Sequence, residues 1–186
     1  MRRYDQSARV YDIQYFDEQE TKIRTIMQNL RVPRGVRILD AGCGTGVLFR
    51  SVVDKADFAV GIDISRGLIQ EARKKTQHYR NVALVLADAD NMPVLDESFD
   101  TILAVTLIQN MPAPTATLTE FKRVAKQTAS IVVTGLKKRF TQEGFLKMLH
   151  EADLIVDSLK LDDMGREYVS ICRKHGAKSK SAMQSR

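Results

Sequence analysis

Two periods of apolar residues alternate along this chain, and they predict an alternation of strands and helices. Short apolar runs are separated by longer segments in which apolar residues recur at i, i+3 and i+4, the spacing of one helix face. This order predicts strand–helix–strand units and a mostly parallel sheet. We expect helices over residues 17–31, 47–56, 65–78, 115–126 and 141–152, and strands over residues 36–41, 58–62, 82–87, 99–107, 130–136, 154–161 and 167–172.

The expected strands are apolar along almost their whole length, which is typical of strands covered by helices on both faces. The last two are joined only by residues 162–166 and are expected to form an antiparallel hairpin. We therefore predict an α/β fold, namely a Rossmann-like, seven-stranded, mostly parallel sheet with helices on both faces and a C-terminal antiparallel hairpin. The expected parts are an N-terminal arm and helix packed on the core (1–35), a central domain (36–173) and a basic, disordered tail (174–186).

The segment that follows the first expected strand is the most informative in the chain. It reads Asp40-Ala41-Gly42-Cys43-Gly44-Thr45-Gly46, so three glycines at alternate positions join a strand to a helix. Glycine lets the backbone adopt positive φ and approach a ligand closely, and the helix behind such a loop offers free amides to an anionic group. The dinucleotide fingerprint would place its third glycine at Val47, and no lysine follows as in a phosphate-binding loop, so NAD and ATP are disfavoured.

Acidic residues end the next two expected strands. Asp63 stands 17 residues after the last glycine, near the spacing at which an acid accepts both hydroxyls of a ribose. Asp88 ends the third strand at the same edge of the sheet, where a carboxylate can accept a hydrogen bond from an exocyclic amine such as that of adenine. The glycine loop and the two acids together predict an adenosine site. The lack of a phosphate cradle favours an adenosine that bears an amino acid.

The string DAGCGTG, followed by GIDIS and LADADNMPVLDESFD, resembles the class I S-adenosylmethionine-dependent methyltransferases, and within them the type 11 group that includes ubiquinone and menaquinone biosynthesis methylases. The similarity runs from about Val36 to Leu136 and implies a methyltransferase with S-adenosylmethionine as its cofactor. The cofactor-binding residues that the resemblance implies are Asp40, Gly42, Cys43, Gly44 and Gly46 at the methionine end, Asp63 and Ile64 at the ribose and adenine, Asp88 and Ala89 at the adenine edge, and Val105 and Thr106 beside the sulfonium.

Methyl transfer from a sulfonium needs alignment of cofactor and acceptor, and a general base only where the acceptor must lose a proton. No catalytic motif is therefore required to stand out. Residues 106–112 lack the Pro-Pro-aromatic motif of amino-methylating relatives and the Pro-Cys of cytosine C5 enzymes, so the acceptors of both are disfavoured. The catalytic candidates are Gln109 and Asn110, whose amides either orient an acceptor or cap the following helix, and Tyr11, which we expect to reach the site from the N-terminal arm.

The chain of 186 residues has a formal net charge of +6, and residues 173–186 contribute five basic residues and no acid. The rest of the chain is therefore almost neutral. Lys137, Lys138 and Arg139 follow the fifth strand at the ligand edge, where little is inserted that could form a lid. We hypothesise that the acceptor is RNA (tRNA or rRNA), bound by these residues and the basic tail. A small molecule such as a quinone-like metabolite, a protein acceptor or a partner protein that completes the open site, and a non-catalytic cofactor-binding subunit are the alternatives.

Other features narrow the class of protein. No apolar run reaches the ~18–20 residues needed to cross a bilayer, and the basic start is not followed by the apolar segment of a secretory signal, so no membrane contact is expected. Cys43 and Cys172 cannot form a disulfide framework, and the three histidines show no metal-binding spacing. We therefore expect a cytoplasmic protein without a metal site.

Overall fold

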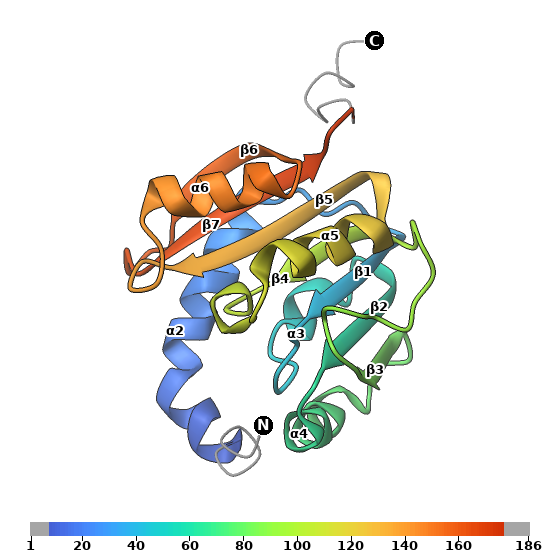
Figure 1. The fold of residues 1–186 in the computed structure, drawn as a ribbon. Helices are drawn as coiled ribbons and strands as arrows, with labels where there is room; N and C mark the ends of the chain where they lie inside the picture. The colour runs from blue at the N-terminus through green and yellow to red at the C-terminus, as the bar shows by residue number, and fades with distance from the viewer. Residues whose placement is uncertain (1–7, 177–186) are drawn as a thin grey trace.

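A sheet of seven strands runs through the centre of the protein in the computed structural model, which describes residues 8–176 (Figure 1). The strands are β1 (Val36–Ala41), β2 (Ala56–Asp63), β3 (Val82–Leu86), β4 (Phe99–Ala104), β5 (Ala125–Leu136), β6 (Leu154–Leu161) and β7 (Glu167–Lys174). The helical elements are α2 (Ala8–Asn29), α3 (Phe49–Val52), α4 (Arg66–Thr76), the 3-10 turn η1 (Ile108–Asn110), α5 (Pro114–Val124) and α6 (Gln142–Glu151).

The strand order is β3-β2-β1-β4-β5-β7-β6. The first five strands of this order are parallel to one another, whereas β7 is antiparallel to both β5 and β6. The predicted fold class is confirmed, including the antiparallel hairpin at one side of the sheet. Because the chain proceeds from β1 outward to β3 and then returns to place β4 beside β1, the order reverses between β1 and β4. Such a switch point is where open α/β sheets bind ligands.

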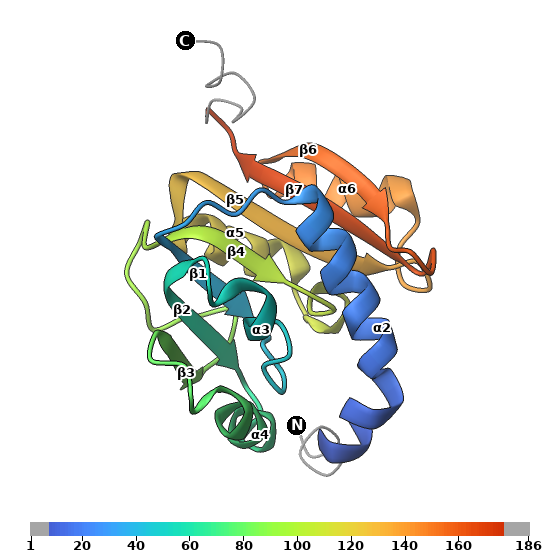
Figure 2. The same cartoon turned by 180° about the vertical axis from the view of Figure 1, so that it is seen from behind.

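Each face of the sheet has its own apolar core, and neighbouring strand residues contribute to opposite cores. Ile38 and Leu103 belong to the core beneath α2 and α3, whereas Leu39 and Ile102 belong to the core beneath α5 and α6. Figure 1 shows α5 and α6 on the near face, and Figure 2 shows α2 and α3 on the opposite face. This two-sided burial explains the continuous apolar runs of the strands.

Two helices begin where polar caps predict. Ser65 accepts a hydrogen bond from the amide of Leu68 at the start of α4, as predicted for an N-cap. Thr141 does the same for the amide of Gly144 at the start of α6. Helix α4 thus begins three residues after the end of β2, and α6 begins six residues after the end of β5.

The limits of several elements differ from those expected, and the differences are largest for α2, α3 and β5. Helix α2 begins at Ala8, because residues 8–16 are helical although tyrosines and charges interrupt their apolar pattern. Helix α3 is confined to Phe49–Val52, since β2 already begins at Ala56. Strand β5 begins at Ala125, directly after α5, and its polar residues 126–128 are partly or fully exposed, which made them resemble a loop. Within residues 8–176, none of the helices combines the length and hydropathy needed to span a membrane.

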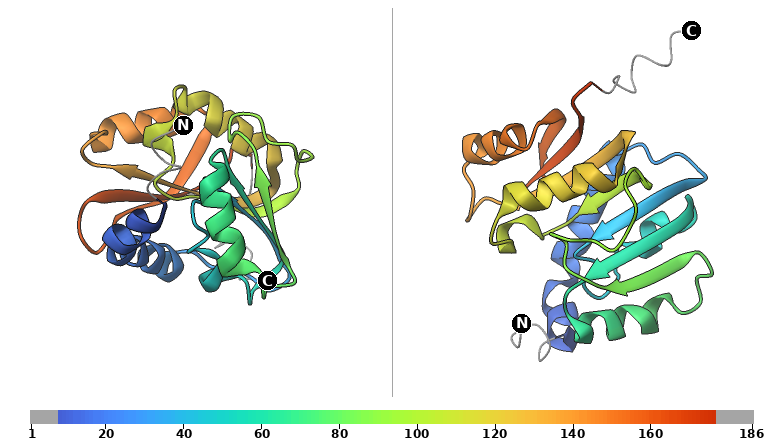
Figure 3. Two further views of the ribbon diagram at one scale, coloured as in Figure 1. Left: turned by 90° about the horizontal axis from the view of Figure 1, so that it is seen from below. Right: turned by 45° about the vertical axis from the view of Figure 1, so that its right-hand side comes forward.

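Helix α2 runs along the edge at which the parallel strands end, and the two views in Figure 3 show it beside that edge. It contacts elements on either side of β1 and β4, namely α3 and the turn between β6 and β7. Glu20 forms an ion pair with Arg50 of α3. Further along the helix, the hydroxyl of Thr25 donates to Asp163, which lies between β6 and β7, at 3.3 Å. The helix therefore borders the switch point between β1 and β4.

Candidate functional site

The glycine loop after β1 is fastened to β2 and leaves room for a ligand. The amides of Gly42 and Cys43 both donate to the carbonyl oxygen of Ile62, at 2.8 and 2.9 Å. Gly42 and Gly44 have φ values of 73° and 54°, which favour glycine. A Cβ on Gly42 would stand 2.9 Å from the side chain of Leu107, whereas a Cβ on Gly44 would meet nothing within 4 Å. The backbone at Gly44 is thus accessible to a ligand, as the predicted cradle requires.

Asp63 connects this loop to the start of α4. One carboxylate oxygen accepts the amide of Gly44 at 2.9 Å, and the other accepts the amide of Ser65 at 2.8 Å. Asp63 is 9% exposed, so the carboxylate is almost buried yet reaches the surface. Each carboxylate oxygen can accept more than one hydrogen bond, which fits the ribose role implied by the resemblance. Ile64 beside it is 51% exposed and offers an apolar surface to a flat ring.

Asp88 lies at the end of the neighbouring strand. The amide of Ala87 donates to the carbonyl oxygen of Asp63 at 3.1 Å, so the pairing of β3 with β2 extends to the edge of the sheet. Asp88 is exposed and accepts the amide of Asp90, whereas Ala89 is buried. The structure therefore brings the glycine loop, Asp63 and Asp88 together at the carboxyl ends of β1, β2 and β3.

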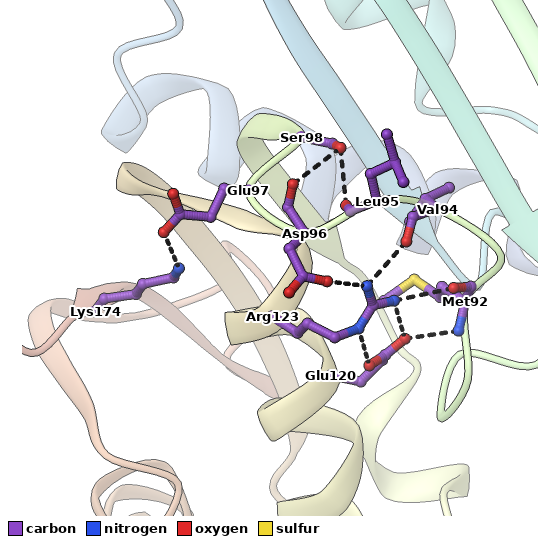
Figure 4. Close-up of polar contacts among 9 residues, drawn as sticks. All are labelled: Met92, Val94, Leu95, Asp96, Glu97, Ser98, Glu120, Arg123 and Lys174. Carbon is purple, nitrogen blue, oxygen red and sulfur yellow. Dashed lines mark hydrogen bonds and ion pairs between the residues drawn. The ribbon is translucent and has the colours of Figure 1, made fainter.

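The loop that follows Asp88 is held by one arginine of α5 (Figure 4). Arg123 donates to the carbonyl oxygens of Met92 and Val94, at 3.0 and 2.9 Å, and to the carboxylate of Asp96 at 2.6 Å. It also binds Glu120, which accepts the amide of Met92, and these hydrogen bonds hold the pKa of Glu120 below its ordinary value. The network fixes the polypeptide directly after the candidate adenine-binding residues.

Burial raises the pKa of two groups in the glycine loop. Burial, reinforced by the negative charge of Asp63, raises the pKa of Asp40 to about 8. Burial, and then the charges of Asp40 and Asp63, raise the pKa of the Cys43 thiol well above its ordinary value. The sulfur of Cys43 fills space beside Gly61, where a Cβ would stand 2.9 Å from it. A protonated, packed thiol fits a structural role better than that of a nucleophile.

The protonation of Asp40 predicts a pH dependence of stability. The folded protein keeps a proton that the unfolded chain releases above the ordinary pKa of 3.8, so the free energy of unfolding falls as pH rises from 3.8 to about 8. The Asp40→Asn variant lacks this titration, and its stability should fall less over that window. Urea unfolding of both proteins at several pH values measures the difference. Parallel pH profiles would contradict the assignment.

The end of β4 adjoins a buried ion pair that the sequence analysis did not identify. The ammonium of Lys22 lies 2.7 Å from the carboxylate of Glu167, and the two side chains are 1% and 0% exposed. The hydroxyl of Thr106 lies between them, accepting from Lys22 at 3.1 Å and donating to Glu167 at 3.3 Å. Lys22 stands four residues before Ile26 on the apolar stripe of the helix, a position at which a cation needs a partner. This position of Lys22 on an apolar stripe was the one feature of the sequence that could have indicated a buried ion pair.

The three catalytic candidates have different environments in the structure. The side-chain amide of Asn110 is exposed and donates to the carbonyl oxygen of Thr106 at 3.0 Å, which is a local backbone contact. The side-chain amide of Gln109 is buried, and neither its nitrogen nor its oxygen has a hydrogen-bond partner. Tyr11 belongs to α2, but its side chain lies outside the described side chains. Val105 is partly buried between the end of β4 and Thr106.

The cationic groups predicted to bind RNA lie in two places. Lys137, Lys138 and Arg139 are exposed in the turn after β5, at the ligand edge. Arg173 and Lys174 belong to β7, where Arg173 pairs with Asp157 at 2.9 Å. The remaining tail, 177–186, lies outside the described residues. Within residues 8–176, no group of three His, Cys, Asp or Glu side chains is arranged to hold a metal ion.

Comparison of the sequence with known proteins gives one consistent result. Residues 33–176 match the profile of a methyltransferase domain family. The demethylmenaquinone methyltransferase of Staphylococcus saprophyticus is 31% identical over 133 residues, which are 70% of this chain and 56% of that protein. The Staphylococcus aureus (strain MRSA252) enzyme of the same name is 30% identical over 134 residues, 70% of this chain and 54% of that protein. The chain thus spans little more than half the length of these curated relatives.

Solved structures share the fold. A chain in the complex between the Haloferax volcanii Trm112 methyltransferase activator and a candidate methyltransferase superposes with a TM-score of 0.85 at 17% identity, covering 92% of this chain and 98% of that one. A S-adenosylmethionine-dependent methyltransferase from Aquifex aeolicus superposes with a TM-score of 0.71 at 19% identity, covering 81% of this chain and 88% of that one. At these identities the likeness concerns the fold alone.

Proposed function

Since this chain belongs to the class I S-adenosylmethionine-dependent methyltransferases, of the type 11 group, we propose that it methylates an acceptor bound at the carboxyl ends of β4 and β5. Its cofactor is S-adenosylmethionine. One observation carries the proposal: the glycine loop, Asp63 and Asp88 lie side by side at the ends of β1, β2 and β3. A nucleoside held there leaves the ends of β4 and β5 for the acceptor.

The protein contributes alignment to this reaction, and the cofactor supplies a methyl group on a cationic sulfur. The exposed backbone at Gly44 and the carboxylate of Asp63 would orient the two ends of the nucleoside. Leu107 packs on Gly42, and this contact positions the segment that follows β4 relative to the glycine loop. The arrangement therefore confines both reactants to one narrow part of the sheet edge.

We propose RNA as the acceptor because cationic residues gather at this part of the edge. Lys137, Lys138 and Arg139 are exposed, and the amide of Lys137 donates to the carbonyl oxygen of Arg166 at 3.0 Å, which brings a fourth exposed cation beside them. Phosphate groups are the partners that such clusters bind. Strand β7 runs from Glu167 at this edge to Lys174 at the opposite end of the sheet, so the proposed RNA surface consists of these four cations and does not include the basic residues of 177–186.

A small-molecule acceptor is the second candidate. It is supported by the demethylmenaquinone methyltransferases among the relatives. It is also supported by two apolar side chains near the same turn, since Leu161 and Met164 are 47% and 44% exposed. A quinone-like ring with an apolar chain would cover such side chains, whereas an RNA would not need them.

A partner protein is a further part of the proposal. The structural neighbour was solved with a methyltransferase activator. In this chain, β3 is an edge strand in which all of the residues Val82–Leu86 are apolar and none is fully buried. Exposed edge strands of this kind readily pair with another chain. A complex would cover β3 and leave the switch point accessible.

Tritium-labelled S-adenosylmethionine identifies the acceptor class. The full chain, with and without a homologue of the activator, is incubated with total RNA, with protein extract and with a metabolite extract. We expect label in the RNA fraction, and label confined to metabolites would select the second candidate. No label in any fraction under either condition would contradict the proposed function.

RNA binding should depend on the cations at the edge. Lys137→Ala combined with Lys138→Ala and Arg139→Ala is expected to weaken RNA binding and to flatten the plot of log affinity against log salt, because each lost phosphate contact lowers that slope by about 0.7–0.9. The control is Arg73→Ala with Lys74→Ala, which removes exposed cations of α4 at the opposite end of the sheet. Equal effects of the two changes would contradict the RNA surface.

A further inference from the structure

Unpartnered polar atoms gather at one part of the sheet edge. Among the described residues, the buried side-chain atoms without a hydrogen-bond partner belong to Gln109, Asp162 and Glu167. Gln109 lies in η1 after β4, and Asp162 and Glu167 flank the turn between β6 and β7. Because Glu167 pairs with Leu136, the last residue of β5, this turn stands at the carboxyl end of β5. Both η1 and this turn therefore lie at the carboxyl ends of β4 and β5, where the acceptor is proposed to bind.

Only one of the two carboxylate oxygens of Glu167 has hydrogen-bond partners. Lys22 and Thr106 both contact Oε1, at 2.7 and 3.3 Å. The side chain is 0% exposed, and Oε2 has no hydrogen-bond partner. The backbone of Glu167 is fixed as well, because Asp162 accepts its amide at 2.8 Å. A buried carboxylate oxygen without a donor is rare in folded proteins and calls for an explanation.

Two residues, Leu107 and Thr106, link the carboxylate of Glu167 to the glycine loop. Leu107 packs directly on Gly42, where an added Cβ would lie 2.9 Å from it. Thr106, the preceding residue, reaches Glu167 with its hydroxyl. The sequence of contacts from Gly42 through Leu107 and Thr106 to Glu167 therefore connects the cofactor loop to the carboxylate without a gap.

Thr106 itself is in a conformation that a β-branched residue rarely adopts. Its φ is 58°, and its amide donates to the hydroxyl of Thr134 at 2.7 Å, which holds the residue there. Strain of this kind persists where the surrounding structure requires it, and it is concentrated at functional sites. Here the strained backbone places the threonine hydroxyl between Lys22 and Glu167.

We propose that Glu167, together with the side-chain amide of Gln109, forms the acceptor subsite and that Oε2 of Glu167 takes the hydrogen of the acceptor group. The inference rests on the proposed function and names the chemistry of its substrate, an acceptor with an N–H or O–H. When the acceptor atom bonds to the methyl carbon, the carbon–sulfur bond breaks and the sulfur keeps the electron pair. The acceptor proton passes to Oε2, and Lys22 balances the charge of the carboxylate beforehand. A ribose hydroxyl of RNA and a quinol hydroxyl both have such a hydrogen.

The Glu167→Gln variant tests this proposal with the full chain. Glutamine keeps the size of the side chain and an oxygen for Lys22, but it cannot take a proton. Methyl transfer from labelled S-adenosylmethionine is measured in two assays, one with total RNA and one with metabolite extract. In the assay in which the wild-type protein transfers label, the rate of the variant should fall by about a hundredfold or more, the effect typical of a lost general base. Affinity for S-adenosylhomocysteine, measured by calorimetry, should change by less than about twofold, since no cofactor contact is removed.

The matched control is Asp163→Asn, which removes an exposed acid in the same turn that also contacts α2. It should leave both readouts unchanged. Because Glu167→Gln leaves Lys22 without its counter-charge, the double variant Lys22→Met/Glu167→Gln is assayed beside it and should show the same loss of transfer. Transfer close to the wild-type rate in a folded variant would overturn the proposal, and so would a parallel loss of S-adenosylhomocysteine binding, which marks a structural role. Failure of the wild type to bind that ligand would instead refute the proposed function on which the subsite rests.

Discussion

The Asp63→Ala variant is expected to bind S-adenosylhomocysteine at least about a hundredfold more weakly than wild type. The carboxylate would accept the ribose hydroxyls, and hydrogen bonds to a charged group contribute about 1.5–3 kcal/mol each. Two of them correspond to a factor of about 100 or more in the dissociation constant. The same oxygens hold the amides of Gly44 and Ser65, so the loop and the start of α4 lose their fixed positions at the same time.

Asp57→Ala is the control for this change. Asp57 belongs to the same strand, is exposed, and lies at the opposite end of β2. Its removal should leave the affinity for the ligand unchanged. Circular dichroism and urea unfolding establish that both variants are folded, and calorimetry measures the affinities. Wild-type affinity in a folded Asp63→Ala protein would exclude Asp63 as the ribose ligand.

The Lys22→Met variant is expected to lose about 3–5 kcal/mol of the free energy of unfolding, the usual result of removing one partner of a buried ion pair. Glu167 is 0% exposed, so its charge would have no counter-ion and no water. The double variant Lys22→Met/Glu167→Gln removes both charges and should recover most of the loss. Urea unfolding curves of the three proteins give the differences.

The exposed ion pair between Glu20 and Arg50 is the internal comparison, because it also joins α2 to the rest of the domain. Arg50→Met should cost no more than about 1 kcal/mol, since exposed pairs contribute little. The difference between the two losses in the free energy of unfolding shows how much depends on burial of the ion pair rather than on its attachment of α2 to the domain. A loss below about 1 kcal/mol in Lys22→Met would show that the buried pair does not stabilise the fold.

Local patterns of the sequence are sufficient to predict the sheet and to place the candidate cofactor residues at one edge of it. The seven strands follow from apolar runs, and Ser65 follows from the preference for polar caps. Asp63 and Asp88 are found because parallel strands end at one edge of a sheet, so residues that follow strands meet there. Each of these predictions requires only the residues next to the motif.

The ion pair between Lys22 and Glu167 could not be predicted in this way, because its partners are distant in the sequence and are joined only when β7 inserts between β5 and β6. Thr106 was predicted to lie beside the sulfonium, but nothing in the sequence indicates its positive φ. The extension of α2 to Ala8 was missed because its first turns lack an apolar stripe. Non-local pairing and backbone strain thus mark the limit of what the sequence reveals.

Calorimetric titration of the folded wild-type chain with S-adenosylhomocysteine tests the central claim most directly. That claim is that the glycine loop, Asp63 and Asp88 form one nucleoside site at the ends of β1, β2 and β3. The account predicts heat that saturates at a single site per chain. A folded protein that gives no heat at any ligand concentration would contradict it.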